Sequence, residues 1–220
     1  MMVKRKEFDQ GLMEISKLLE DMGSRVGQAL SDSMDALKNG DVENASAIVR
    51  LDAELNQLEE KINVIGSNLI ATQQPVAKDL RRILIAFRIA SDLERMGDLS
   101  VDIAKVVIRM DGQELIKPII DLPRMAQFVT VMIQESLQAY IEENVDLAYK
   151  MAKDDDQVDA IYSQLLQELM SMMMENSKAV GQAMLLSFVG RFIERIADHA
   201  TNIGESVVYL MTGKRPELNQ

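Results

Sequence analysis

Two copies of one acidic motif lie 100 residues apart in the chain. The first copy contains Glu94 and Asp98, and the second contains Glu194 and Asp198. Side chains four residues apart in a helix are neighbours, so each copy brings two carboxylates together. Like charges at that spacing cost about 0.2–0.5 kcal/mol per pair. Either a bound cation or the adjacent arginines and solvent would offset this cost, and the spacing leaves both interpretations open.

The helical angles within these motifs predict where the carboxylates point. Side chains advance by about 100° per residue. On that spacing Ile89, Met96 and Ile103 fall on one apolar stripe, which predicts core positions. Glu94 and the other acids of the same stretch fall on the opposite side. We therefore expect an anionic ridge on the outside of the helix in each copy, with Asp98 and Asp102 in the first and Asp198 in the second.

A second pair of acidic motifs precedes the first, with an offset of 103 residues. Asp52 and Asn56 are four apart in the first half, and Asp155 and Asp159 are four apart in the second. All four flank an apolar stripe, so they could approach the other acids across the bundle surface. One acidic cluster is then expected in each half, composed of Asp52, Glu94, Asp98 and Asp102, and of Asp155, Asp159, Glu194 and Asp198. The alternative for Asp155 is a helix N-terminal acid, favoured by the helix dipole.

Oxygen-only ligand sets suit hard cations such as Mg²⁺, Ca²⁺, Mn²⁺ or ferric iron rather than classical zinc. A ferritin-like di-iron enzyme would need inward-facing Glu-x-x-His pairs. The chain has a single histidine, His199, and Ile196 stands three residues before it. We therefore expect no enzyme, and keep a carboxylate-bridged metal-storage protein or metal-dependent enzyme as the alternative.

Composition excludes several other classes of function. The formal net charge of −11 argues against binding to nucleic acid, which requires a basic face. The absence of cysteine excludes disulfides, thiol nucleophiles and iron–sulfur ligation, and fits a cytoplasmic location. The longest apolar run, near 183–193, is shorter than the roughly 20 residues that span a bilayer. We expect no signal peptide, because no long apolar run follows the charged residues at the start.

Apolar residues recur at helical spacing through most of the chain, and aromatic residues make up only 4% of it. This pattern predicts an all-α protein of six long helices, with two antiparallel three-helix bundles in one elongated rod. The predicted first bundle covers residues 1–112 and the second 118–213, joined by a linker at 113–117. Residues 214–220 are expected to be a frayed tail.

The two motif copies, from Leu93 to Ile103 and from Ile193 to Ile203, resemble those of the PhoU family of phosphate-uptake regulators. The segments 74–81 and 207–213 strengthen this resemblance, which covers essentially the whole chain. It implies two three-helix bundles related by a pseudo-twofold axis, and a non-enzymatic regulator in the cytoplasm. Such a protein acts between the high-affinity phosphate ABC transporter and a sensor histidine kinase, as a negative regulator of the phosphate-starvation response. The resemblance also implies a homodimer that reaches the membrane only through its partners.

The resemblance further implies multinuclear metal clusters on the acidic motifs. Iron is the first expectation, with Mg, Mn, Ca, Ni or Zn as other possibilities. The metal motifs fall on Glu94, Asp98, Glu194 and Asp198, and less directly on Asp52, Asp155 and Asp159. Two departures stand out, since Asp102 replaces a common Asn and Asn56 replaces an acid. We therefore expect the two clusters to differ in charge or occupancy.

Overall fold

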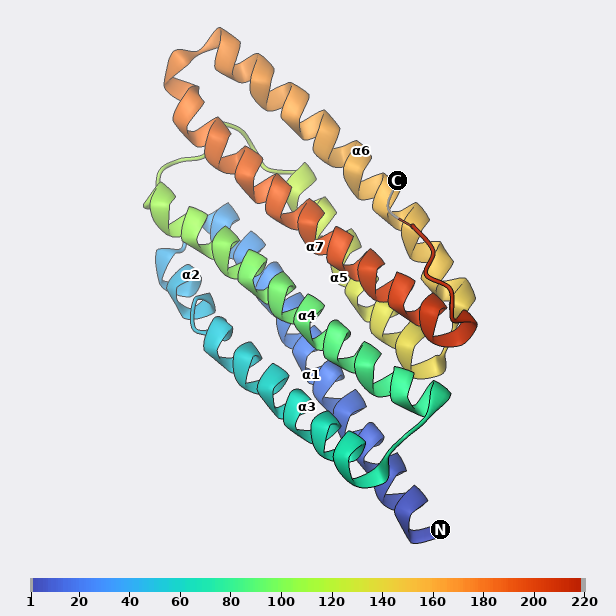
Figure 1. Cartoon of the computed structure of the whole chain (residues 1–220). Helices are drawn as coiled ribbons and strands as arrows, with labels where there is room; N and C mark the ends of the chain where they lie inside the picture. Colours follow the sequence, from blue (N-terminus) through green and yellow to red (C-terminus); the bar gives the residue numbers. More distant parts are fainter. Residues whose placement is uncertain (1, 219–220) are drawn as a thin grey trace.

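A computed structural model describes residues 2–218, and all of its long elements are α-helices (Figure 1). The fold class predicted from sequence is confirmed, because no strand occurs within this range. In chain order the elements are α1 (Met2–Asn39), α2 (Val42–Ile48), α3 (Leu51–Gln73), α4 (Ala77–Met110), α5 (Asp121–Glu142), α6 (Val145–Glu175), the short 3₁₀ helix η1 (Ser177–Ala179) and α7 (Val180–Thr212).

The second of the six predicted helices is divided into α2 and α3, because the chain turns at Val49 and Arg50. Asp41 caps the first of them, accepting a hydrogen bond from the backbone N–H of Asn44. The turn lets the short α2 bury Ala45 and Ile48 against α1 and α4. A single straight helix could not follow the directions of both α2 and α3. The burial of Ala45 and Ile48 therefore explains the break between them.

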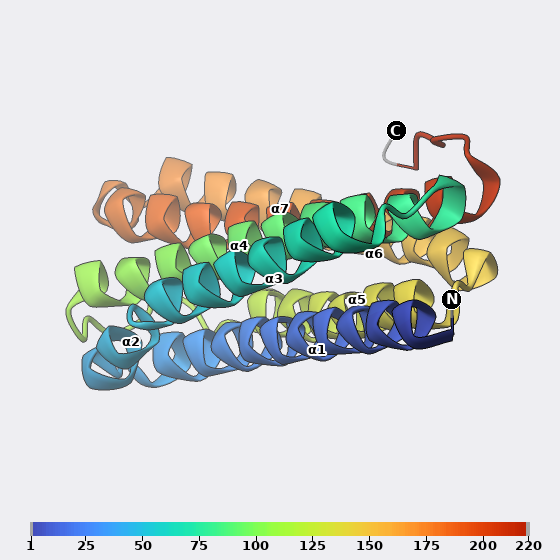
Figure 2. The ribbon, with the colours of Figure 1, turned by 60° about the horizontal axis from the view of Figure 1, so that its bottom comes forward.

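The two halves, α1–α4 and α5–α7, lie side by side along their length (Figures 1 and 2). Helices α4 and α7 pack against each other in the middle, and α1 packs against α5. Buried side chains from both halves form one continuous core. Helices α4 and α7 are therefore each covered by helices of their own half on one side and by the other half on another side.

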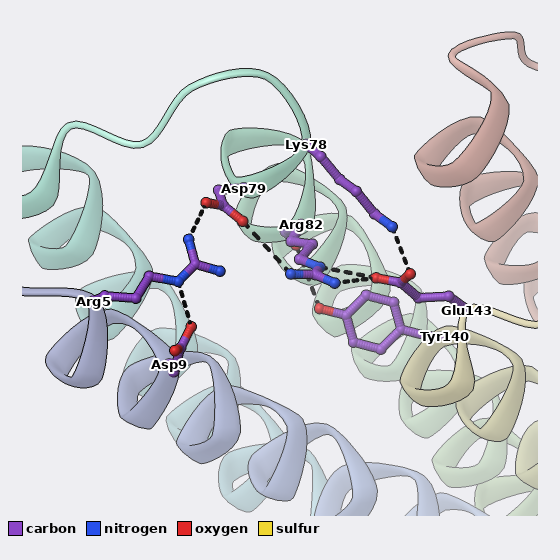
Figure 3. Close-up of polar contacts among 7 residues, drawn as sticks. All are labelled: Arg5, Asp9, Lys78, Asp79, Arg82, Tyr140 and Glu143. Carbon is purple, nitrogen blue, oxygen red and sulfur yellow. Dashed lines mark hydrogen bonds and ion pairs between the residues drawn. The ribbon is translucent and has the colours of Figure 1, made fainter. Parts of the chain in front are cut away.

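The end of the molecule where α4 begins is closed by a network of charged side chains (Figure 3). Lys78 and Arg82 of α4 both donate to the carboxylate of Glu143, in the turn between α5 and α6. The distance from Lys78 Nζ to Glu143 Oε2 is 2.6 Å. Arg5 of α1 donates to Asp79 of α4, which also pairs with Arg82. The network therefore joins the two halves at this end.

The internal duplication places Gln182 of α7 at the position equivalent to Arg82. Gln182 holds the segment between α4 and α5, because its amide accepts from the N–H of Ile116 at 2.5 Å and donates to the carbonyl of Glu114 at 3.0 Å. Arg82 and Gln182 thus perform the same task at opposite ends of the molecule. Arg82, at the start of α4, is bonded to the turn between α5 and α6. Gln182, at the start of α7, is bonded to the segment between α4 and α5.

Glu143 has a left-handed backbone with a φ of 54°. The equivalent position in the first half is Gly40, with a φ of 63°. A left-handed conformation costs about 1–2 kcal/mol for a residue other than glycine. The two cations that Glu143 binds explain why a charged side chain, rather than glycine, stands in this turn.

We expect Glu143→Gln to lower the free energy of unfolding by about 1–3 kcal/mol at pH 7, since Lys78 and Arg82 lose a charged acceptor. Burial tends to raise the pKa of Glu143, but the hydrogen bonds from Lys78 and Arg82 lower it overall. The stabilisation is therefore present above the unfolded pKa and is lost as the pH falls through the lowered folded pKa. Urea unfolding at pH 7 and at acidic pH measures it, with the exposed neighbour Glu142→Gln as control. Equal stability of the two variants would contradict the role of Glu143.

The chain between α4 and α5 comprises residues 111–120 and includes the predicted linker at 113–117. Lys117 pairs with Glu168 of α6, so this segment is held to the second half. After α7 the backbone N–H of Leu218 donates to Glu205 at 2.9 Å, so residues 214–218 fold back along α7. Residues 1 and 219–220, which belong to the predicted first bundle and the predicted tail, lie outside the described residues.

Candidate metal centres

The second acidic cluster lies between α6 and α7. Asp155 and Asp159 project from α6, and Glu194 and Asp198 project from α7. Asp155 is only 7% exposed, which makes it the one buried carboxylate among the described residues. Helix α6 begins at Val145, so Asp155 lies in its middle. The structure therefore excludes the alternative in which Asp155 is a helix N-terminal acid.

Every carboxylate of this second cluster has a raised pKa. Burial raises the pKa of Asp155 to about 7, with further contributions from Asp198, Asp159 and Glu194. Burial is also the main cause at Glu194, Asp198 and Asp159, and like charges add to it. Oδ1 of Asp155 and Oε2 of Glu194 are buried without a hydrogen-bond donor. Leaving such oxygens unpaired costs free energy, which a cation between them would recover.

Two basic side chains border the second cluster. Arg191, one turn before Glu194 on α7, donates to Glu194 Oε1. His199 faces the opposite way, toward the first half, where its Nδ1 lies 3.0 Å from Asp92 Oδ1 on α4. His199 therefore joins α7 to α4.

The first acidic cluster lies between α3 and α4. Burial raises the pKa of both Glu94 and Asp98, and the neighbouring Asp52 of α3 adds to both shifts. Arg95 pairs with Asp98 at 2.9 Å and with Glu94 at 3.4 Å. Asp52 itself is exposed, in the first turn of α3. This cluster is therefore more open than the second, which contains the buried Asp155.

Asp102 lies at the edge of the first cluster. Its side chain is 41% exposed and pairs with Lys105 at 2.8 Å. Like-charge repulsion with Asp98 is reduced by Lys105, which also interacts with Asp52 and Asp98. The structure therefore gives Asp102 a cationic partner of its own, and leaves Glu94, Asp98 and Asp52 as the close set in the first half.

The prediction that these acids face away from the protein was wrong for the two glutamates. The side chains of Glu94 and Glu194 are each only 12% exposed. Neither glutamate belongs to the hydrophobic core. Glu94 faces α3, and Glu194 faces α6. The reason is that α4 and α7 are central helices with neighbours on several sides. A helical angle measured on one helix does not show that a second helix covers the opposite face.

Two residues that the sequence analysis missed complete these surroundings. Glu59 of α3 adds negative charge beside Glu94. Burial raises the pKa of Tyr162 of α6, at the equivalent position 103 residues later, and the nearby Glu194 adds to this shift. Glu59 follows Asp52 by seven residues, and Tyr162 follows Asp155 by seven, so helical spacing could have identified both.

The donor set of the second cluster fits a hard cation. It offers carboxylate oxygens only, two of them buried and unpaired, with pKa values raised by burial and further by mutual repulsion. Among the described residues no three acidic or histidine side chains are already drawn together closely enough to hold an ion. Metal binding therefore requires these carboxylates to close in from the separations seen here.

Comparison with known proteins decides the family. A family model described as the PhoU domain matches residues 19–107 and again residues 122–207. The chain belongs to the PhoU family. The two matched ranges correspond to the two halves of the structure, so the duplication of the acidic motif reflects a duplicated domain.

Relatives of known name match over nearly the whole chain. A phosphate-specific transport system accessory protein PhoU homolog from Clostridium acetobutylicum is 40% identical over 98% of this chain and 99% of its own length. The PhoU accessory protein of Escherichia coli K12 is 29% identical over 94% of this chain and 86% of its own. The chain is thus similar to accessory proteins of the phosphate-specific transport system.

Solved PhoU structures match the fold. The crystal structure of PhoU from Pseudomonas aeruginosa superimposes with a TM-score of 0.88 at 33% identity, over 94% of this chain and all of that one. The phosphate transport system regulatory protein PhoU from Streptococcus pneumoniae gives 0.87 at 30% identity, over 96% and 99%. In the described part of this chain no helix is both long and apolar enough to span a membrane.

Proposed function

We propose that this protein is a cytoplasmic adaptor that connects the high-affinity phosphate ABC transporter to a sensor histidine kinase. It binds the transporter ATPase when phosphate is plentiful and keeps the phosphate-starvation response off. Family membership supports the transporter side of this proposal, since the relatives are accessory proteins of the phosphate-specific transport system. The net charge of −11 is consistent with protein partners rather than nucleic acid.

The observation that carries the proposal is the pair of acidic clusters, one in each matched domain. Their carboxylates repel one another and are partly buried, an arrangement that costs stability without a ligand. A bound metal ion, with iron as first choice, would neutralise each cluster and fix the spacing of α3 to α4 and of α6 to α7. Glu94, Asp98 and Asp52 would hold it in the first half, and Asp155, Asp159, Glu194 and Asp198 in the second.

The adaptor role is tested by pull-down with the purified transporter ATPase and, separately, with the cytoplasmic part of the sensor kinase. Both are expected to be retained by this protein in phosphate-replete buffer. The metal-loaded and metal-stripped forms are compared, and the metal-loaded form is expected to retain more of each partner. Retention of neither partner under high phosphate would overturn the proposal.

We expect Asp198→Ala to release metal from the second cluster without unfolding the chain. Asp198 lies outside the hydrophobic core, and its pKa is raised by burial and by Asp159, so its removal relieves repulsion. Metal content after dialysis and the melting temperature in chelator measure the two effects. Asp102→Ala is the control, expected to keep its metal because Asp102 pairs with Lys105. A large drop in the melting temperature of metal-free Asp198→Ala would contradict this placement.

A further inference from the structure

A groove of about 460 Å³ lies along the seam between the two halves, with Asp102 and Lys105, at the edge of the first acidic cluster, in its lining. Its walls come from the second half of α4 and the first half of α7. The apolar part consists of Val106, Leu185, Phe188 and Phe192, and Phe188 is 45% exposed. An aromatic side chain left open to solvent next to other apolar groups is typical of a surface that binds a partner.

The internal duplication supplies a comparison for this groove. The pseudo-twofold axis relates the seam to itself, so every lining residue has an equivalent at the other end of the seam. There Phe188 is replaced by Arg88 and Phe192 by Asp92, while Ser206 replaces Val106. At that end the same two helices are joined by the contact between His199 of α7 and Asp92 of α4. The fold therefore does not require the apolar surface, and its presence at one end alone calls for another explanation.

The charge around the groove indicates what kind of segment it fits. Lys105 and Arg109 lie on its α4 wall, and Asp102 is the one acid of the lining, already paired with Lys105. Arg109 makes no ion pair with the described residues. The groove is thus a cationic spot on a chain whose net charge is −11. The equivalents of Lys105 and Arg109 are Glu205 and Tyr209, so neither of these two cations has a cationic counterpart at the other end.

We infer that this groove binds a segment of a partner protein that presents an apolar side chain flanked by carboxylates, in the manner of an amphipathic acidic helix. The apolar side chain would lie against Phe188 and Phe192, and a carboxylate would pair with Arg109. The inference goes beyond the proposed adaptor function, because it concerns the chemistry of the bound segment and does not depend on which transport or signalling protein carries it.

The test uses two synthetic helical peptides labelled with fluorescein. One has leucine and phenylalanine on one face and glutamate on its flanks, and the other has lysine in place of glutamate. Fluorescence anisotropy with the full-length protein is expected to show binding of the glutamate peptide only. Arg109→Glu and Phe188→Ser are each expected to weaken that binding about tenfold or more. Arg88→Glu is the matched control, with the same charge change on the same helix at the other end of the seam, and should leave binding unchanged.

Three outcomes would overturn the inference. They are equal binding of the glutamate and lysine peptides, equal loss in Arg88→Glu and Arg109→Glu, and absence of binding by a correctly folded wild-type protein. Sedimentation of the same variants detects a competing occupant, since Phe188→Ser would convert a dimer to a monomer if a second copy filled the groove. The pull-down with the transporter ATPase is a separate experiment, so failure of the adaptor proposal and failure of this inference can be told apart.

Discussion

Asp155→Asn is expected to make the metal-free protein more stable at pH 8, by up to about 4 kcal/mol in the free energy of unfolding. Asp155 is buried with an unpaired Oδ1, and its pKa is raised from 3.8 to about 7. The folded protein therefore holds this proton more tightly than the unfolded chain does. Asparagine has a similar shape and carries no charge, so the variant avoids the cost of burying a carboxylate.

The sign of the pH dependence follows from the same shift. The contribution of Asp155 to stability is fully present below the unfolded pKa near 3.8 and is lost as the pH rises through the folded pKa near 7. Wild-type stability in chelator should therefore fall between about pH 4 and pH 7, and the fall should be smaller in Asp155→Asn. Urea unfolding over this range measures it, with the exposed Asp156→Asn as control. A variant that is less stable than wild type at pH 8 in chelator would contradict the raised pKa.

Added metal is expected to produce the second large effect, which is a gain in the stability of the folded wild-type protein. A ligand at 100 times its Kd stabilises the folded state by about 2.7 kcal/mol per site. Mn²⁺ is a suitable probe, because carboxylate oxygens suit it. Wild type should gain stability from metal at both clusters. The double variant Glu194→Gln with Asp198→Asn should gain stability from metal at the first cluster only. Thermal unfolding with increasing Mn²⁺ at pH 7.5 measures this gain.

This gain should also depend on pH, more steeply for the second cluster than for the first. Metal binding requires deprotonated carboxylates, and Asp155 holds its proton up to about pH 7. At pH 5.5 the stabilisation of wild type by Mn²⁺ should therefore approach that of the double variant. If the double variant gains as much stability as wild type at pH 7.5, the second cluster is not a metal site.

The repetitive features of this protein were predictable from sequence, because they are local. Apolar residues at helical spacing placed most of the helices, and the repeated Glu-Arg-x-x-Asp motif placed Glu94, Asp98, Glu194 and Asp198 on equivalent central helices. The approach of α3 to α4 and of α6 to α7 was also predicted. Both helix pairs are in contact, and in the second half Asp198 lies near enough to Asp155 to raise its pKa further.

What could not be predicted depends on contacts between elements distant in sequence. A wheel drawn for α4 alone cannot show that α3 covers Glu94, so the ridge expected on the outside is partly buried. The hydrogen bonds from Arg82 to Glu143 join residues 61 positions apart in the sequence, and no local sequence pattern at either residue predicts them. The break at Val49 and Arg50 serves packing of α2 on α1 and α4, which the apolar spacing of α2 itself does not reveal.

The most direct test of the account is diffraction from metal-loaded crystals at the absorption edge of iron, together with elemental analysis of the same protein. The account predicts anomalous scattering at two places, one beside Glu94 and Asp98 between α3 and α4, and one among Asp155, Glu194 and Asp198 between α6 and α7. Less than one equivalent of tightly held metal, or scattering at neither cluster, would show that the two acidic clusters are not metal centres.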